Sequence, residues 1–256
     1  MTDDVGVTLP WVEQGTALVR QVLDGLDDAA LAGPSALSGW SRGHVVAHLA
    51  RNADALRRLL HWARTGEETP MYASPEQRDG EIAASAARPA ADLRADWART
   101  AEALGRDLAG TTGDAWAATV RTAQGRAVPA AQVPWMRVRE VWLHAVDLDA
   151  GVGVDVLPDG LAAALLDDVT ALLSTREGCP AVELRTPGGG AWRLGARGRD
   201  GATAPAVVTG TPAALAGWVT GRGQAGVVPL EPEDGERGGT ARGAAGPALP
   251  ALPRWL

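Results

Sequence analysis

Apolar side chains recur at helical spacing through the first 150 residues. The segment 10–26 places them every three or four positions, a pattern typical of an amphipathic helix that buries one face. The segment 41–65 repeats this pattern over a greater length, with Ser41 as a candidate N-cap. The apolar positions are Val12, Leu18, Val19, Val22, Leu23 and Leu26 in the first segment and Val45, Ala47, Leu49, Leu56, Leu59, Leu60 and Trp62 in the second.

Two further helices follow by the same criterion. One begins near Pro89, a favourable first-turn residue. The segment 110–132 is irregular, and Pro134 then opens a helix over 134–149. The apolar positions of the third helix are Leu93, Trp97, Leu104 and Leu108. Four helices of this length, joined by connections of mixed length, predict a four-helix bundle.

The pattern changes after residue 150. Gly151 and Gly153 interrupt it, a helix is predicted over 158–173, and another over 211–219 is capped by Thr211. Short apolar runs bounded by Gly and Pro predict strands between them, at 181–186, 191–194 and 204–209. We therefore expect a helical domain over 1–151 and a smaller α+β domain over 152–256. The Gly-, Glu- and Arg-rich stretch 231–247 is expected to be a mobile loop.

Composition excludes several classes of function. The 24 basic and 31 acidic residues give a net charge of -7, which disfavours a nucleic-acid binder and is compatible with a monomer. Every basic residue is arginine, so Schiff-base catalysis by lysine is excluded. The single Cys179 excludes an intrachain disulfide and a multi-cysteine metal site. The acidic N-terminus lacks the features of a signal peptide, and no segment approaches the roughly 18–20 apolar residues of a membrane span. We expect a cytoplasmic protein.

Histidine and glutamate are the candidate metal ligands. Glu140 and His144 are four residues apart, so both project from one face of the predicted helix. His44 and His48 share that spacing on the longer helix. A bundle that brings one of these histidines to Glu140 and His144 has three protein ligands and an open fourth position, the arrangement of a catalytic Zn²⁺ site. Each pair alone is more commonly a surface pair. Periodicity does not choose between His44 and His48, although apolar neighbours slightly favour His48.

Several segments resemble known sequences. The stretch 39–53, GWSRGHVVAHLARNA, resembles the metal-binding helix of mycothiol-dependent enzymes in the DinB-like superfamily. The segments EETPMY at 67–72, TAQGR at 122–126 and GRG at 221–223 resemble the mycothiol-dependent maleylpyruvate isomerases more specifically. The resemblance covers nearly the whole chain and thins over 152–210. The stretch 231–247 departs from it by being longer than the family needs.

This resemblance implies a site and a reaction. It makes His48, Glu140 and His144 the ligands of Zn²⁺ or another divalent metal, and leaves His44 as a neighbour of the metal. It implies active-site roles for Arg78 and for Arg222, the latter supplied by the C-terminal domain. The implied reaction is the mycothiol-dependent cis–trans isomerisation of maleylpyruvate, a small dicarboxylate, to fumarylpyruvate in gentisate degradation.

Two other functions share parts of this pattern. A mycothiol S-transferase acting on another electrophile would have the same bundle and the same three ligands. A non-catalytic binding module is compatible with the C-terminal α+β domain, which is similar to sterol-carrier-like domains. The segments around Tyr72 and Gln124 favour the isomerase over the transferase, and a binding module has no use for an open metal site.

Overall fold

The computed structural model describes residues 2–195, 205–230 and 248–255. By its internal contacts the chain divides into two compact units, Met1–Val152 and Gly153–Leu256, and each is described by itself. None of the helices in the described ranges is long and apolar enough to cross a membrane.

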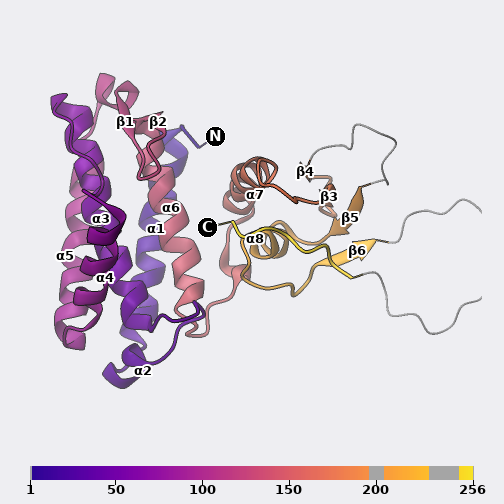
Figure 1. Ribbon diagram of the computed structural model, residues 1–256, viewed down its shortest axis with the longest axis horizontal. Coiled ribbons are helices and arrows are strands. Elements are labelled where there is room, and N and C mark those ends of the chain that lie inside the picture. The colour runs from indigo at the N-terminus through magenta and orange to yellow at the C-terminus, as the bar shows by residue number, and fades with distance from the viewer. Residues whose placement is uncertain (1, 196–204, 231–247, 256) are drawn as a thin grey trace, which may run out of the picture. The chain divides into compact units, whose positions relative to one another are not determined.

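Four long helices make up the first unit (Figure 1). They are α1 (Val5–Asp24), α3 (Arg42–Thr65), α5 (Ala90–Ala109) and α6 (Val133–Asp147). Helix α1 packs against α5 and α6, and α3 packs against the same two helices. Their apolar faces form a core in which Val19, Leu59 and Val138 have no exposed surface. This confirms the four-helix bundle predicted from the periodicity.

Gly15 allows the close approach of α1 to α6. A Cβ atom built at Gly15 would collide with Cγ2 of Val141 and lie 2.7 Å from Nε1 of Trp142. That indole nitrogen donates a 2.9 Å hydrogen bond to the Trp11 carbonyl. A side chain at position 15 must therefore displace buried groups on α6.

We expect Gly15→Ala to destabilise the first unit by about 1–3 kcal/mol, the usual cost of overpacking a well-packed core. Gly105→Ala is the matched control, because a Cβ at this helical glycine of α5 meets no atom within 4 Å. It should be stabilising by about 0.5–1 kcal/mol through better helix propensity. Thermal and urea unfolding of the three proteins compares them. A Gly15→Ala protein as stable as the parent would contradict the close contact.

The bundle differs from the prediction at its start and in one connection. Helix α1 begins at Val5, because the Asp4 carboxylate caps it by accepting from the Gly6 amide. The segment predicted to be irregular contains an antiparallel hairpin, β1 (Thr119–Arg121) and β2 (Ala127–Pro129), flanked by two short 3-10 helices. Strands of three residues are too short to show a clear alternating pattern. The helix α2 (Asp28–Ala32) was also missed, because its five residues are too few to show a helical period.

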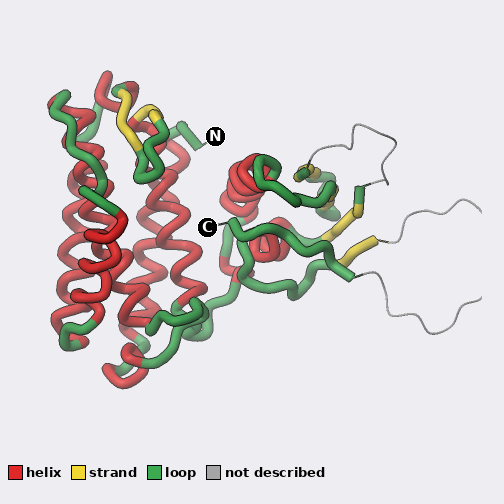
Figure 2. The backbone as a smooth tube through the Cα atoms, in the orientation of Figure 1, coloured by secondary structure: helices red, strands yellow, loops and turns green. Residues whose placement is uncertain are grey.

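In its described residues, the second unit combines two α-helices and the short 3-10 helix Val154–Val156 with a four-stranded sheet (Figure 2). The helices are α7 (Asp159–Leu173) and α8 (Pro212–Val219), which pack against each other. The sheet order is β4-β3-β5-β6, with β3 and β5 parallel and the outer pairs antiparallel. Its strands are β3 (Val182–Arg185), β4 (Ala191–Leu194), β5 (Ala206–Thr209) and β6 (Val228–Leu230).

The α+β class of this unit agrees with the prediction, except that β6 was not predicted. Its middle residue is Pro229, and a proline in a sequence argues against a strand. Proline is tolerated in strands at the edge of a sheet, and β6 is such an edge strand. The expected mobile loop over 231–247 lies outside the described residues.

Candidate metal centre

The start of α3 determines which of His44 and His48 faces the bundle interior. Ser41 caps the helix: its Oγ accepts from the His44 backbone amide, and Nδ1 of the His44 ring accepts from the Ser41 amide at 3.3 Å. The His44 ring is therefore turned back to its own helix end. His48 lies one turn further on, is 5% exposed, and its side chain reaches α6.

His48, Glu140 and His144 converge at one point. One potential ligand atom from each lies within 4.8 Å of the others. Oε2 of Glu140 lies 2.7 Å from Nε2 of His48 and 3.2 Å from Nε2 of His144. The two imidazole rings meet edge to face, with centroids 4.7 Å apart. Helical spacing on α6 and packing of α3 against α6 thus bring together the three residues that the sequence singled out.

Burial and charge perturb all three groups. Burial by itself raises the pKa of the Glu140 carboxyl, but the two adjacent histidines outweigh this and hold that pKa well below its usual value. Burial lowers the pKa of His48 despite the carboxylate beside it. Burial also acts to lower the pKa of His144, but hydrogen bonds to Asp147 and Glu140 raise it overall. Shifts of this kind are typical of a functional site.

Asp147 fixes the orientation of the His144 ring. Its buried carboxylate lies 2.8 Å from Nδ1 of His144 and accepts a hydrogen bond from it, so that Nε2 is the ring nitrogen that faces the cluster. A carboxylate behind a histidine is the usual outer partner of a metal-binding imidazole. Sequence reasoning missed Asp147, although its position three residues after His144 on a helix was an available signal.

This donor set fits a divalent cation. Two imidazole nitrogens and one carboxylate oxygen suit Zn²⁺, and several other divalent ions as well. The three ligand atoms are close enough to share one ion, and the outer partner of His144 is present. Trp40 covers one side of the cluster, with its ring centroid 5.7 Å from that of His48.

Arg78 reaches the cluster from α4 (Pro75–Ala86), a helix that the periodicity did not predict. Its Nη2 lies 3.4 Å from Nδ1 of His48, and its guanidinium carbon lies 5.9 Å from the Tyr72 ring centroid. Burial raises the pKa of the Tyr72 hydroxyl. The available signal for α4 was Ser74 followed by Pro75, an N-cap with proline at the first helical position.

Comparison with known proteins places the chain in a family. The model of the mycothiol maleylpyruvate isomerase N-terminal domain matches residues 12–149. The protein in the crystal structure of the mycothiol-dependent maleylpyruvate isomerase shares 36% sequence identity with this chain. The match covers 98% of this chain and 97% of that chain, and the TM-score is 0.85. The chain belongs to the mycothiol maleylpyruvate isomerase family. A mutant of that isomerase with one histidine replaced by alanine matches at 35% identity, with the same coverage and TM-score. No curated protein sequence matches the chain.

Within this family, the matched N-terminal domain contains the whole cluster and Arg78, whereas Arg222 lies in the second unit. Gly221 ends α8 with a φ of 79°, and the Arg222 amide then donates to the Gly217 carbonyl at 2.7 Å, as in a Schellman motif. The Arg222 side chain donates to the Thr220 carbonyl and lies over the ring of Trp255, 5.8 Å from its centroid. The helix end and a buried indole thus hold this guanidinium in place.

Proposed function

We propose that this protein catalyses the mycothiol-dependent isomerisation of maleylpyruvate to fumarylpyruvate, a step of gentisate breakdown. The observation that supports this most is the convergence of His48, Glu140 and His144 in a chain that matches an isomerase of this name along 98% of its length. The three converging residues alone are not sufficient, because such a ligand set suits many reactions. The structural match alone is not sufficient either, because a fold does not determine the chemistry.

In this proposal His48, Glu140 and His144 hold Zn²⁺ or another divalent metal. When bound, such an ion supplies Lewis acidity and lowers the pKa of a thiol or water that it contacts. Asp147 keeps the proton of His144 on Nδ1, which leaves Nε2 free as a ligand. Trp40 and the surrounding bundle limit the access of water to His48, which is 5% exposed.

The reaction needs a temporary loss of double-bond character. Mycothiol, when bound, would supply the thiolate for this: addition to one alkene carbon would push the π electrons onto the conjugated ketone oxygen and leave a single bond that can rotate. Return of those electrons would break the carbon–sulfur bond and release the thiolate and the trans product. A thiolate suits this role because it is both a good nucleophile and a good leaving group.

The substrate carries two carboxylates and develops a further negative charge as the enolate. Arginine binds such groups through planar, bidentate hydrogen bonds. Arg78 lies beside His48 at the cluster, and we assign it to one of these charges. We assign Arg222 to another, since the family resemblance implies that the second domain supplies it.

The test is the rate of maleylpyruvate conversion to fumarylpyruvate by the Zn²⁺-loaded protein, with and without mycothiol. We expect turnover only when both the metal and mycothiol are present, and loss of turnover after chelation. If the fully loaded protein conjugates mycothiol to other electrophiles but leaves maleylpyruvate unchanged, the protein is a mycothiol S-transferase and the proposed reaction is wrong.

A further inference from the structure

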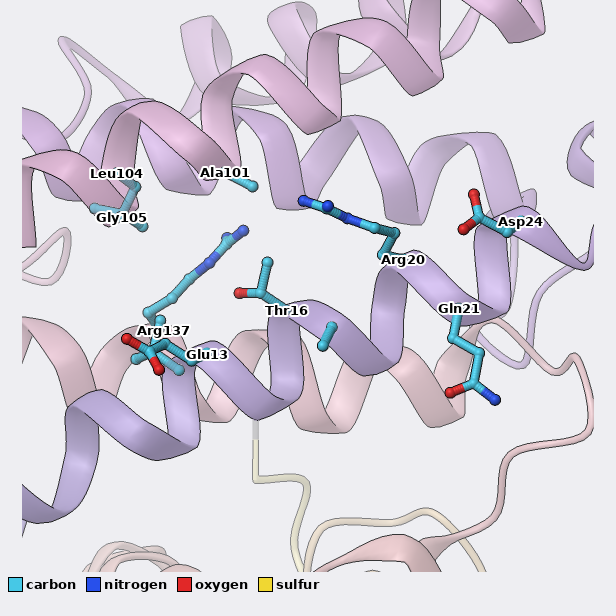
Figure 3. A pocket seen from close by; sticks show the side chains of 11 residues that line it. Glu13, Thr16, Arg20, Gln21, Asp24, Ala101, Leu104, Gly105 and Arg137 are labelled. Atoms are coloured by element: carbon cyan, nitrogen blue, oxygen red, sulfur yellow. The ribbon is translucent and has the colours of Figure 1, made fainter.

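A second cleft lies on the bundle between α1 and α5. Its volume is about 490 Å³, within the range of about 300–1,000 Å³ that is common for small-molecule sites. Residues of α1 and α5 form its walls, and Arg137 of α6 closes it from below (Figure 3). His48, Glu140 and His144 are not among the lining residues, so the cleft has a lining different from that of the candidate metal centre.

Arg137 is the unusual member of this cleft. It is 1% exposed, although arginine is almost never buried without partners. Its Nη1 donates to the Leu49 carbonyl and to Oδ1 of Asn52, each at 2.8 Å. Its Nη2 is buried and has no hydrogen-bond partner within the described part of the chain. A buried donor without an acceptor is costly, and more so on a charged group.

The charge of Arg137 persists at neutral pH, because burial lowers its pKa only to about 10. No carboxylate of the described residues forms an ion pair with this guanidinium at 4.0 Å or less. Glu13 and Asp24 also line the cleft, but both are exposed, and water and salt screen exposed charges. Glu140, on the same helix as Arg137, attracts this guanidinium without forming an ion pair with it. The inner end of the cleft therefore holds a buried cation whose Nη2 has no acceptor among the described residues.

The rest of the cleft suits an apolar body. Val12, Ala17, Ala101 and Leu104 contribute aliphatic walls. The side chains of Arg20 and Arg137 both point into the space between α1 and Ala101, with Thr16 below it (Figure 3). A ligand that matches this lining has one anionic end and a compact hydrocarbon part.

We propose that the cleft between α1 and α5 binds a small monocarboxylate with an apolar body, whose carboxylate accepts a hydrogen bond from Nη2 of Arg137. This site is additional to the proposed isomerase site and does not depend on it. A neutral ligand of the same shape offers Nη2 only a neutral acceptor, whereas a carboxylate forms a charge-assisted hydrogen bond with it, so the site should discriminate on charge.

Calorimetric titration of the full chain with 2-naphthoate and with its neutral isostere 2-naphthamide tests this. We expect naphthoate to bind one molecule per chain, and naphthamide to bind at least about tenfold more weakly, in line with a charge-assisted hydrogen bond. No naphthoate binding, or equal affinity for the two compounds, would overturn the proposal.

Variants of Gly105 then locate the binding. This α5 residue lines the cleft and has free space where a Cβ would stand, so Gly105→Leu fills the cleft and Gly105→Ala is its matched control. We expect at least tenfold weaker naphthoate binding for Gly105→Leu and unchanged binding for Gly105→Ala, with the metal content of both unchanged. If Gly105→Leu does not fold, Ala17→Leu fills the cleft from α1. Unchanged binding by a folded cleft-filling variant would show that naphthoate binds elsewhere, and the assignment would be wrong.

Discussion

His48→Gln is expected to lose both tight metal binding and isomerase activity. The substitution removes one of three nitrogen or oxygen donors that lie within 4.8 Å of one another, and it breaks the 2.7 Å contact with Glu140. Loss of an outer partner of a metal ligand typically costs about 10–100-fold in affinity, and loss of a ligand should cost more. Calorimetric titration with Zn²⁺ and metal analysis after dialysis measure the first effect. The rate with maleylpyruvate and mycothiol measures the second.

His44→Gln is the matched control, because His44 shares the helix and the residue type with His48. Its ring belongs to the capping box of α3, and glutamine is one of the residues that normally complete such a box. This variant should keep both its metal and its activity. If it lost the metal while His48→Gln kept it, the ligand assignment between the two histidines would be reversed.

The choice between these two histidines also shows where sequence reasoning ends. Their spacing places both on related faces of one helix, so periodicity alone left the choice open. The structure separates them through Ser41, whose cap uses the His44 ring. Such a cap is hard to foresee, because the usual partner of the N-cap serine is glutamate or glutamine.

The long helices could be predicted because each buries a continuous apolar stripe. The segment 41–65 became α3 (Arg42–Thr65) almost without change, since Ser41 marks its start and Gly66, with a φ of 77°, its end. Helix α4 (Pro75–Ala86) has no such stripe, because only Ile82 and Ser85 are buried among its twelve residues. Arg78 therefore could not be placed beside His48 from the pattern.

The proposed role of Arg222 could not be derived from the pattern at all. The chain has 24 arginines, and an isolated arginine is most commonly a solvated surface charge. The structure adds that this side chain is half-buried, held by the Thr220 carbonyl and packed on Trp255. These contacts hold the guanidinium in one place, as the proposed contact with a substrate anion requires.

Arg222→Met is accordingly expected to lower kcat/KM for maleylpyruvate by about 10–100-fold, because a hydrogen bond to a charged group contributes about 1.5–3 kcal/mol. Methionine keeps much of the stem that packs on Trp255, so the fold should survive, and the zinc content should stay that of the parent protein. Arg222→Lys should recover only part of the loss, since an ammonium cannot form the bidentate contact. Steady-state kinetics, zinc analysis and circular dichroism of each variant provide the measurements.

Arg193→Met is the control for charge removal within the same unit. Arg193 lies on β4, is mostly exposed, and pairs with Glu183 rather than with any group assigned to the reaction. Glu183 keeps its 2.7 Å contact with Arg185 when Arg193 is replaced, so the kinetics and fold of this variant should be nearly those of the parent. If both variants reduced kcat/KM equally, the effect would be one of overall charge. If Arg222→Met left kcat/KM unchanged, a direct contact between Arg222 and the substrate would be ruled out, and Arg78 would remain the one assigned arginine.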